Sequence, residues 1–202
     1  TPDYDLSQLP NQALSLPLLL VSPELLKDLS ETPTPQGIMA IIDLPSSPLG
    51  WQPSGQSYLI LDAVQDPGNL GTLIRTADAA AYDGVILGKG TVDVYNDKVL
   101  RASQGSLWHL EVVSLDLLQE ARPAFEAAGI PWFVTALHQE AKAYTDVPTD
   151  QALALVLGNE GQGVSEAVIQ VADQTIYIPM PGQAESLNVA VAGGILMFYF
   201  QA

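Results

Sequence analysis

Hydrophobic and polar positions change their spacing repeatedly between residue 58 and the C-terminus. Short apolar runs, which are typical of buried strands, alternate with segments whose apolar residues recur at the spacing of amphipathic helices. The predicted strands are residues 58–62, 85–87, 110–113, 132–135, 153–157 and 175–178. Because helices separate these strands, the pattern predicts an α/β fold with a mostly parallel sheet and helices on both faces.

Turn and cap residues indicate where the helices begin and end. A turn at residues 66–69 opens a helix whose apolar face consists of Leu70, Leu73, Ile74 and Ala77. The other predicted helices are residues 96–102, residues 114–128 with Ser114 as N-cap and Gly129 as terminator, residues 165–171 with Ser165 as N-cap, and residues 187–200 with Ser186 as N-cap.

Residues 1–57 have a different character and are rich in Pro and Ser. Residues 16–21 and 37–42 are predicted strands, and residues 23–29 are a predicted helix. These elements are too few to enclose a core by themselves. The sequence therefore predicts three parts: a partial N-terminal domain at residues 1–43, a linker at residues 44–57, and a main domain at residues 58–202.

Composition narrows the functional classes. The chain has 7 Lys and Arg against 23 Asp and Glu, for a formal net charge of −16, and it has no Cys and only 2 His. Disulfides, a thiolate nucleophile and a metal site are therefore not expected. We expect neither a membrane span nor a signal peptide, and hence a cytoplasmic protein. Because Thr1 is not an initiator Met, we also expect that the natural N-terminus is missing.

The acidity bears directly on nucleic-acid binding. A domain that binds RNA usually carries a basic surface, and a strongly acidic one repels phosphates at long range. Contacts to RNA would then be local, around Arg75, Lys89, Lys98 and Arg101.

Two loops carry polar side chains next to backbone that a ligand could approach. In one loop this backbone is rich in glycine, and in the other it is the start of a helix. The segment GNEGQG at residues 158–163 directly follows a predicted strand, and its glycines let the backbone turn tightly beside a ligand. Its spacing matches neither the dinucleotide fingerprint nor a Walker loop. Before the last predicted helix, Glu185, Ser186 and Asn188 accompany free backbone N–H groups. Both loops are compatible with a ligand site, although the second taken alone is more typical of an ordinary capped helix, because the motif is short and such caps are common.

Arg75 lies off the apolar face of the first predicted helix of the main domain, so its side chain should point away from the core. A guanidinium group suits phosphate recognition, although a surface Arg on a helix needs no function.

Three segments together resemble the motifs of a known family. They are LDAVQDPGNLGTLIRTADAAAYDGVIL at residues 61–87, LALVLGNEGQGVS at residues 153–165, and IYIPMPGQAESLNVAVAGGILMFYF at residues 176–200. In this order they resemble the SpoU (TrmH-like) class of SPOUT methyltransferases. The resemblance implies transfer of a methyl group from S-adenosylmethionine to a ribose 2′-hydroxyl of tRNA or rRNA. It also implies a deep C-terminal trefoil knot, a homodimer, and an N-terminal domain resembling ribosomal protein L30e.

The resemblance assigns roles to individual residues. The implied catalytic set is Asn69, Arg75, Glu160, Ser186 and Asn188. The implied cofactor site consists of Thr135, Ala136, Leu157, Gly158, Gly163, Ile178, Met180 and Leu187. The RNA-side candidates are Lys98, Arg101 and Ser103. Because Arg stays protonated in proteins, we expect Arg75 to position the ribose and its phosphate, with a phosphate oxygen as proton acceptor. Asn69 is expected to orient Arg75 or the helix start.

Three other interpretations stay open. A family member could methylate an acceptor other than ribose, or the chain could be a catalytically silent cofactor-binding or RNA-binding protein. The intact polar set argues against silence, whereas the acidity favours it. A Rossmann-type dehydrogenase would explain the α/β pattern but lacks its glycine fingerprint.

Overall fold

The computed structural model describes residues 1, 4–9, 13–30, 32, 34–45, 50–137 and 140–201. The chain divides into two compact units, Thr1–Ser46 and Ser47–Ala202, and each is described by itself. The boundary falls inside residues 44–57, the expected linker, of which residues 46–49 lie outside the described part of the chain. All three motif segments belong to the second unit.

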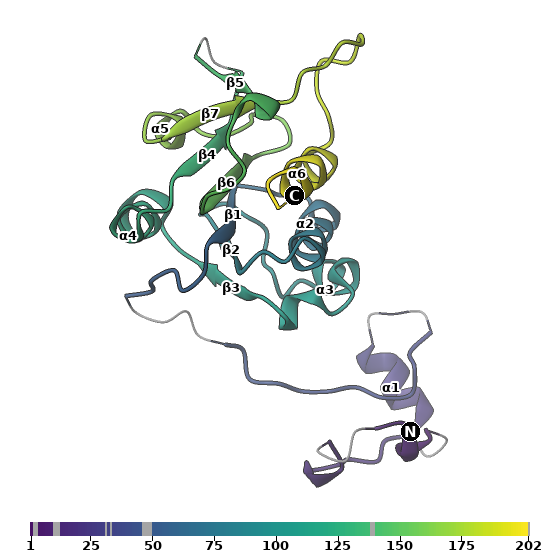
Figure 1. Ribbon diagram of the computed structural model, residues 1–202. Helices are drawn as coiled ribbons and strands as arrows, with labels where there is room; N and C mark the ends of the chain where they lie inside the picture. The colour runs from purple at the N-terminus through teal and green to yellow at the C-terminus, as the bar shows by residue number, and fades with distance from the viewer. Residues whose placement is uncertain are drawn as a thin grey trace. The chain divides into compact units, whose positions relative to one another are not determined.

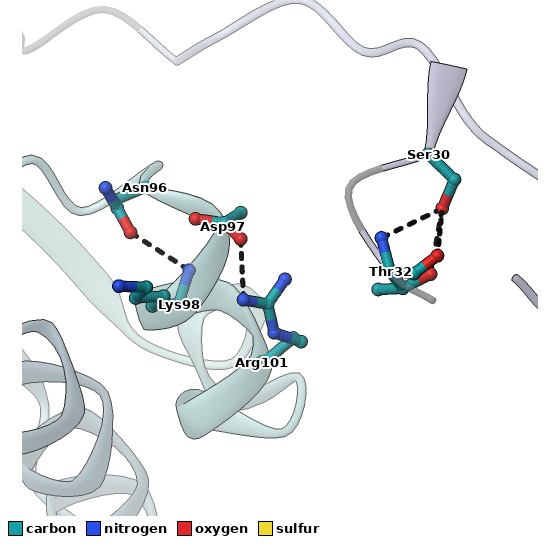
Figure 2. Close-up of polar contacts among 6 residues, drawn as sticks. All are labelled: Ser30, Thr32, Asn96, Asp97, Lys98 and Arg101. Atoms are coloured by element: carbon teal, nitrogen blue, oxygen red, sulfur yellow. Dashed lines mark hydrogen bonds and ion pairs between the residues drawn. The ribbon is translucent and has the colours of Figure 1, made fainter. Parts of the chain in front are cut away.

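In the unit Thr1–Ser46, the predicted helix is confirmed as α1, Pro23–Leu29. Its N-cap is Ser22, whose hydroxyl oxygen accepts a hydrogen bond from the backbone N–H of Leu25 at 3.2 Å. Beyond the helix, the hydroxyl groups of Ser30 and Thr32 are hydrogen-bonded at 2.8 Å (Figure 2). Two short 3-10 helices, η1 Leu6–Gln8 and η2 Ala13–Ser15, precede α1.

The strands predicted at residues 16–21 and 37–42 are wrong, because neither segment forms a strand in the described part of the chain. A lone extended segment leaves its backbone N–H and C=O groups without a ladder, so an apolar pattern alone does not make it a strand. Leu19 and Ile41, from the two segments, are 86% and 95% exposed.

A parallel sheet forms the centre of the unit Ser47–Ala202. In the described residues it has seven strands in the order β3-β2-β1-β6-β4-β7-β5. The strands are β1 Ser57–Asp62, β2 Gly84–Leu87, β3 Glu111–Ser114, β4 Trp132–Thr135, β5 Lys142–Ala143, β6 Leu153–Gly158 and β7 Gln174–Tyr177. Every pairing between these strands is parallel, which confirms the predicted α/β class. The sequence missed β5, which has only two residues and no periodicity to detect.

Helices cover both faces of the sheet, as predicted (Figure 1). One face carries α2 Pro67–Ala79, α3 Asp97–Ser103 and α6 Val189–Tyr199, and the other carries α4 Arg122–Ala128 and α5 Glu166–Ile169. Side chains of β1 alternate between the two cores: Leu59 and Leu61 belong to the first, and Tyr58 and Ile60 to the second. No helix in the described residues is long and apolar enough to cross a membrane. The knot stays a prediction.

Two helix starts differ from the prediction. The segment expected to begin at Ser114 instead begins with a π-helical turn, Leu117–Ala121, whose N-cap Asp116 accepts two backbone hydrogen bonds. The last helix begins two residues later than expected, because Asn188 rather than Ser186 caps it. An Asn side chain caps as well as Ser does, so the prediction of Ser186 overlooked Asn188, two residues further along.

Other helix ends agree with the sequence. Gly129 ends α4 in the left-handed conformation with φ 70°, and Ser165 occupies the N-cap position of α5. Asn96 caps α3 by accepting a hydrogen bond from the backbone N–H of Lys98 at 2.9 Å (Figure 2).

Candidate active site

The carboxyl ends of β1 and β6 bring the first two motifs together. The two strands pair in register, so Asp62 lies beside Gly158. The loop after β1 runs into α2, whose N-cap Asp66 accepts a hydrogen bond from the backbone N–H of Asn69 at 2.7 Å. The loop after β6 carries Glu160. In open parallel sheets, ligands bind at this edge.

Asn69 connects the three motifs through its side-chain amide. Its Nδ2 donates to Oε1 of Glu160 at 3.0 Å, and its Oδ1 accepts from Nδ2 of Asn188 at 2.9 Å. The Oδ1 of Asn188 accepts from the N–H groups of Ala190 and Val191, so only its NH₂ group can face Asn69. We call this set the amide bridge: Glu160, Asn69 and Asn188, one residue from each motif.

Glu160 is held as a carboxylate. Its Oε1 and Oε2 also accept hydrogen bonds from the backbone N–H groups of Asp66 and Gln65, at 3.1 and 3.2 Å. Partial burial raises the pKa of Glu160, but the hydrogen bonds from Asn69 and from backbone N–H groups outweigh burial and lower this pKa below its ordinary value. A carboxylate with a lowered pKa and occupied lone pairs is a weak base, so its geometry indicates a positioning role.

The glycine loop after β6 is closed tightly on itself. Asn159 and Gly163 exchange two backbone hydrogen bonds of 2.9 Å each. A Cβ atom on Gly158 would lie 2.1 Å from the backbone of Gly163 and Val164, so no side chain fits there. The side chain of Asn159 donates to the carbonyl of Ala63 at 2.9 Å, which fastens this loop to the loop after β1.

The loop between β7 and α6 is the open side of the site. Residues 179–187 make no hydrogen bond within the described part of the chain, and the loop extends away from the sheet (Figure 1). Ser186 and Leu187 are both exposed on it. The structure therefore brings Asn188 to the amide bridge and leaves Ser186 outside it.

The remaining cofactor candidates lie where β4, β6 and β7 end. The hydroxyl of Thr135 donates to a backbone carbonyl of β6 at 3.0 Å, and the N–H of Ala136 donates to a carbonyl of β7 at 3.1 Å. Leu157 is 1% exposed as a whole residue and packs in the core, so it has no surface open to a ligand in this structure. Ile178 and Met180 are half-buried beyond the end of β7.

Arg75 points away from the core, as predicted, but it is not part of the amide bridge. It is exposed on α2, six residues after Asn69, which is about 9 Å further along the helix axis. Asn69 was expected to orient Arg75 or the helix start; in the described residues its amide is bonded to Glu160 and Asn188, and no hydrogen bond joins it to Arg75. Arg75 instead lines a groove of about 310 Å³ that also includes Phe198 of α6.

The three RNA-side candidates on α3 differ in availability. Lys98 is exposed. Arg101 forms an ion pair with Asp97 at 2.6 Å and keeps 48% of its side chain exposed. Ser103 is 1% exposed and its hydroxyl donates to the carbonyl of Leu100, so its side chain cannot reach RNA in this structure.

Two residues that organise the site were not singled out from the sequence. Asp66 caps α2, and its position directly before Pro67 is a recognisable helix-start signal. Asn159 fastens the glycine loop to Ala63, a partner 96 residues away, and no local pattern indicates such a bond.

Solved structures share this fold. An rRNA methyltransferase from Sinorhizobium meliloti with bound AdoMet aligns with a TM-score of 0.80 at 32% identity, covering 89% of this chain and 69% of that one. The SpoU methyltransferase AviRb from Streptomyces viridochromogenes, in complex with AdoMet, aligns with a TM-score of 0.78 at 30% identity, covering 91% and 72%. The fold and the site define a methyltransferase of the SPOUT class.

The chain belongs to the SpoU rRNA Methylase family, whose family model matches residues 56–198. A relative in Bacillus subtilis (strain 168), the 23S rRNA (guanosine(2553)-2′-O)-methyltransferase RlmP, is 44% identical over 182 residues, which are 90% of this chain and 71% of the relative. The family resemblance carried by the three motifs is therefore confirmed.

Proposed function

We propose that this chain transfers a methyl group from S-adenosylmethionine to a ribose 2′-hydroxyl of RNA, with ribosomal RNA as the substrate. The observation that carries the proposal is the amide bridge, which fixes one polar residue of each motif at the carboxyl edge of the sheet. The 44% identity to RlmP, a 23S rRNA 2′-O-methyltransferase, supports the choice of acceptor. An RNA substrate also supports a cytoplasmic location, which is part of the proposal.

The residues at this edge fit S-adenosylmethionine. The crowded turn at Gly158 has no room for a side chain, and residues 179–187 carry N–H and C=O groups that have no partner in the described chain. Ile178 and Leu187 add apolar surface for an adenine ring, and Leu187 is 38% exposed in this structure. When bound, the cofactor supplies a methyl group on a positively charged sulfur.

Alignment of the ribose oxygen with the methyl carbon and the sulfur is the main requirement of the reaction. The 2′-oxygen forms a bond to the carbon while the carbon–sulfur bond breaks, and the hydroxyl proton must leave. Both carboxylate oxygens of Glu160 already accept hydrogen bonds, from Gln65, Asp66 and Asn69, so Glu160 is occupied as a positioning group. In this proposal Arg75 holds an RNA phosphate in place, and an oxygen of that phosphate, fixed beside the 2′-hydroxyl, receives the proton.

Pairing of two copies through α6 is part of the proposal. Val191 and Phe198 are 53% and 54% exposed, and Ile195 is 38% exposed, although all three are large and apolar. A second copy over this face would remove that apolar area from water. Because Phe198 lines the same groove as Arg75, pairing would place Arg75 next to the subunit interface.

Residues 1–43 belong, in this proposal, to an L30e-like substrate-binding domain, and the C-terminal segment is knotted around the cofactor site. The exposed apolar residues of the two extended segments, Leu19 and Ile41 among them, support the first point. Apolar residues in that number are typical of a surface that another part of a domain covers.

A methyl-transfer assay with two variants tests the proposed function. The wild-type chain should transfer labelled methyl groups to unmodified ribosomal RNA. Arg75→Ala should abolish transfer and leave the affinity for S-adenosylhomocysteine unchanged in calorimetry, whereas Leu187→Arg should weaken cofactor binding itself. Equal loss of cofactor affinity in both variants would contradict this division of roles, and no transfer by the wild type would contradict the proposed function.

A further inference from the structure

The loop after β2 is fixed to the loop that leads into the candidate site. β2 lies next to β1 in the sheet. The backbone N–H of Gly88 and the hydroxyl of Thr91 both donate to the carbonyl of Leu61, at 2.8 and 3.2 Å. A Cβ on Gly88 would lie 2.9 Å from that same carbonyl, which shows how closely the loop after β2 approaches the end of β1.

Lys89 stands at the tip of this loop. Thr91 closes a turn by donating its N–H to the carbonyl of Gly88 at 3.1 Å, and Gly90 inside the turn has φ +90°, a conformation that favours glycine. Gly90 rests against Ala63, since a Cβ on Gly90 would lie 3.2 Å from the Cβ of Ala63. The Lys89 side chain is exposed on this rigid base.

The same Ala63 connects this turn to the active-site loops. Its carbonyl accepts the hydrogen bond from Asn159, the residue before Glu160. Ala63 has φ 59°, an uncommon conformation for a residue with a side chain, and such conformations concentrate at functional sites. Lys89 is therefore held in a fixed relation to the amide bridge through the backbone of one short loop.

Lys89 is also one of the few cations that remain available. The chain has 7 basic residues and a net charge of −16. Arg101 and Arg122 are engaged with Asp97 and Asp173, each at 2.6 Å, whereas Lys89 makes no hydrogen bond or ion pair in the described part of the chain. In so acidic a protein, affinity for a phosphate backbone depends on such individual contacts.

We propose that Lys89 is a positioning residue that binds a phosphate of the RNA beside the nucleotide to be methylated. This inference rests on the proposed function. RNA that delivers a ribose to the ends of β1 and β6 meets the neighbouring β2 loop next, where an ammonium group on a rigid turn can hold its backbone. Phosphate contacts of this kind fix register and orientation without reading sequence.

A salt series with a matched charge control tests this role. Lys142 on β5 is also exposed and unpaired in the described chain, but β1, β6, β4 and β7 separate β5 from β2. Lys89→Ala should raise KM for RNA about fivefold at low salt, as for loss of one exposed ion pair. The slope of log affinity against log salt should fall by about 0.7, as for one phosphate contact on a single strand. Lys89→Arg keeps the positive charge and should have the wild-type KM and the wild-type salt slope.

Measurements of kcat and of cofactor affinity distinguish a role in positioning RNA from a role in the chemical step or in folding. In Lys89→Ala, kcat and the affinity for S-adenosylhomocysteine should stay at the wild-type values, and Lys142→Ala should leave every parameter unchanged. Identical KM values and salt slopes in Lys89→Ala and Lys142→Ala would overturn the inference while leaving the proposed function intact. A wild-type chain that methylates no RNA would contradict the proposed function, and this inference with it.

Discussion

Asn69 has two side-chain partners, and both come from other motifs. Glu160 and Asn188 are 91 and 119 residues away along the chain. Family resemblance could name all three residues as catalytic candidates, but helical periodicity carries no information about partners at such separations. Periodicity did predict that Arg75 points outward, because that depends only on the face of one helix. Sequence thus identifies candidate residues more readily than the bonds between them.

Asn188 has two tasks that substitution can separate. Its Oδ1 caps α6, and its Nδ2 donates to Asn69. Asn188→Ser keeps a capping oxygen and loses the amide donor, so thermal stability should stay near wild type while kcat falls about 100-fold from misplacement. Asn188→Ala should lose the same activity and also about 1 kcal/mol of stability. Full activity in Asn188→Ser would show that the link to Asn69 is dispensable.

Glu160 should make stability depend on pH in acid. Its pKa in the folded chain lies below the ordinary value of 4.5, so its contribution is complete above that value and is lost as pH falls toward the folded-state pKa. Wild type and Glu160→Gln should therefore differ by a constant free energy of unfolding near neutral pH, and this difference should shrink below 4.5. Urea denaturation across a pH series measures it, and a difference that grows in acid would be contrary to the account.

At the scale of elements, two predictions matched the structure at both ends of the element. β4 at Trp132–Thr135 and α1 at Pro23–Leu29 have the predicted bounds. The predicted strands at residues 16–21 and 37–42 failed, since a strand needs a partner that the segment itself does not specify. α6 starts later than predicted because Asn188 caps it, and the same side chain also donates to Asn69.

The glycine loop after β6 allows a matched pair of substitutions. Gly158→Ala would place a methyl group 2.1 Å from the returning backbone, so it should lower the free energy of unfolding by about 1–3 kcal/mol and weaken cofactor binding. Gly161→Ala meets its nearest atom, on Asn159, at an ordinary 3.6 Å and should leave both quantities near wild type. Denaturation and calorimetry with S-adenosylhomocysteine decide the matter, and equal effects of the two changes would refute the crowding argument.

At the scale of the whole molecule, two features of a single copy are unfavourable for the proposed function or for the stability of an isolated chain. The net charge of −16 opposes RNA, and the outer side of α6 exposes Val191, Ile195 and Phe198. A second copy would cover the apolar face, and the few available cations would supply local phosphate contacts. Composition could show the acidity, but it could not show which cations are available to bind phosphate, because that depends on where each cation lies in the fold.

Pairing through α6 predicts a specific loss of assembly. Phe198→Glu places a charge in the proposed interface, so light scattering should report a dimer for the wild type and a monomer for the variant at micromolar concentration. Trp108→Glu changes an aromatic residue of similar exposure, 53%, that lies in the 3-10 helix Ser106–Trp108 rather than on α6, and it should leave the dimer intact. A monomeric wild type, or a variant that still pairs, would exclude α6 as the interface.

The position of the transferred methyl group tests the central claim most directly. Ribosomal RNA that lacks the modification is incubated with S-adenosylmethionine and either the wild-type chain or Arg75→Ala, then digested to nucleosides for mass spectrometry. The account predicts one 2′-O-methylated nucleoside with the wild type and none with the variant. A methyl group on a base, or equal ribose methylation by both proteins, would contradict it.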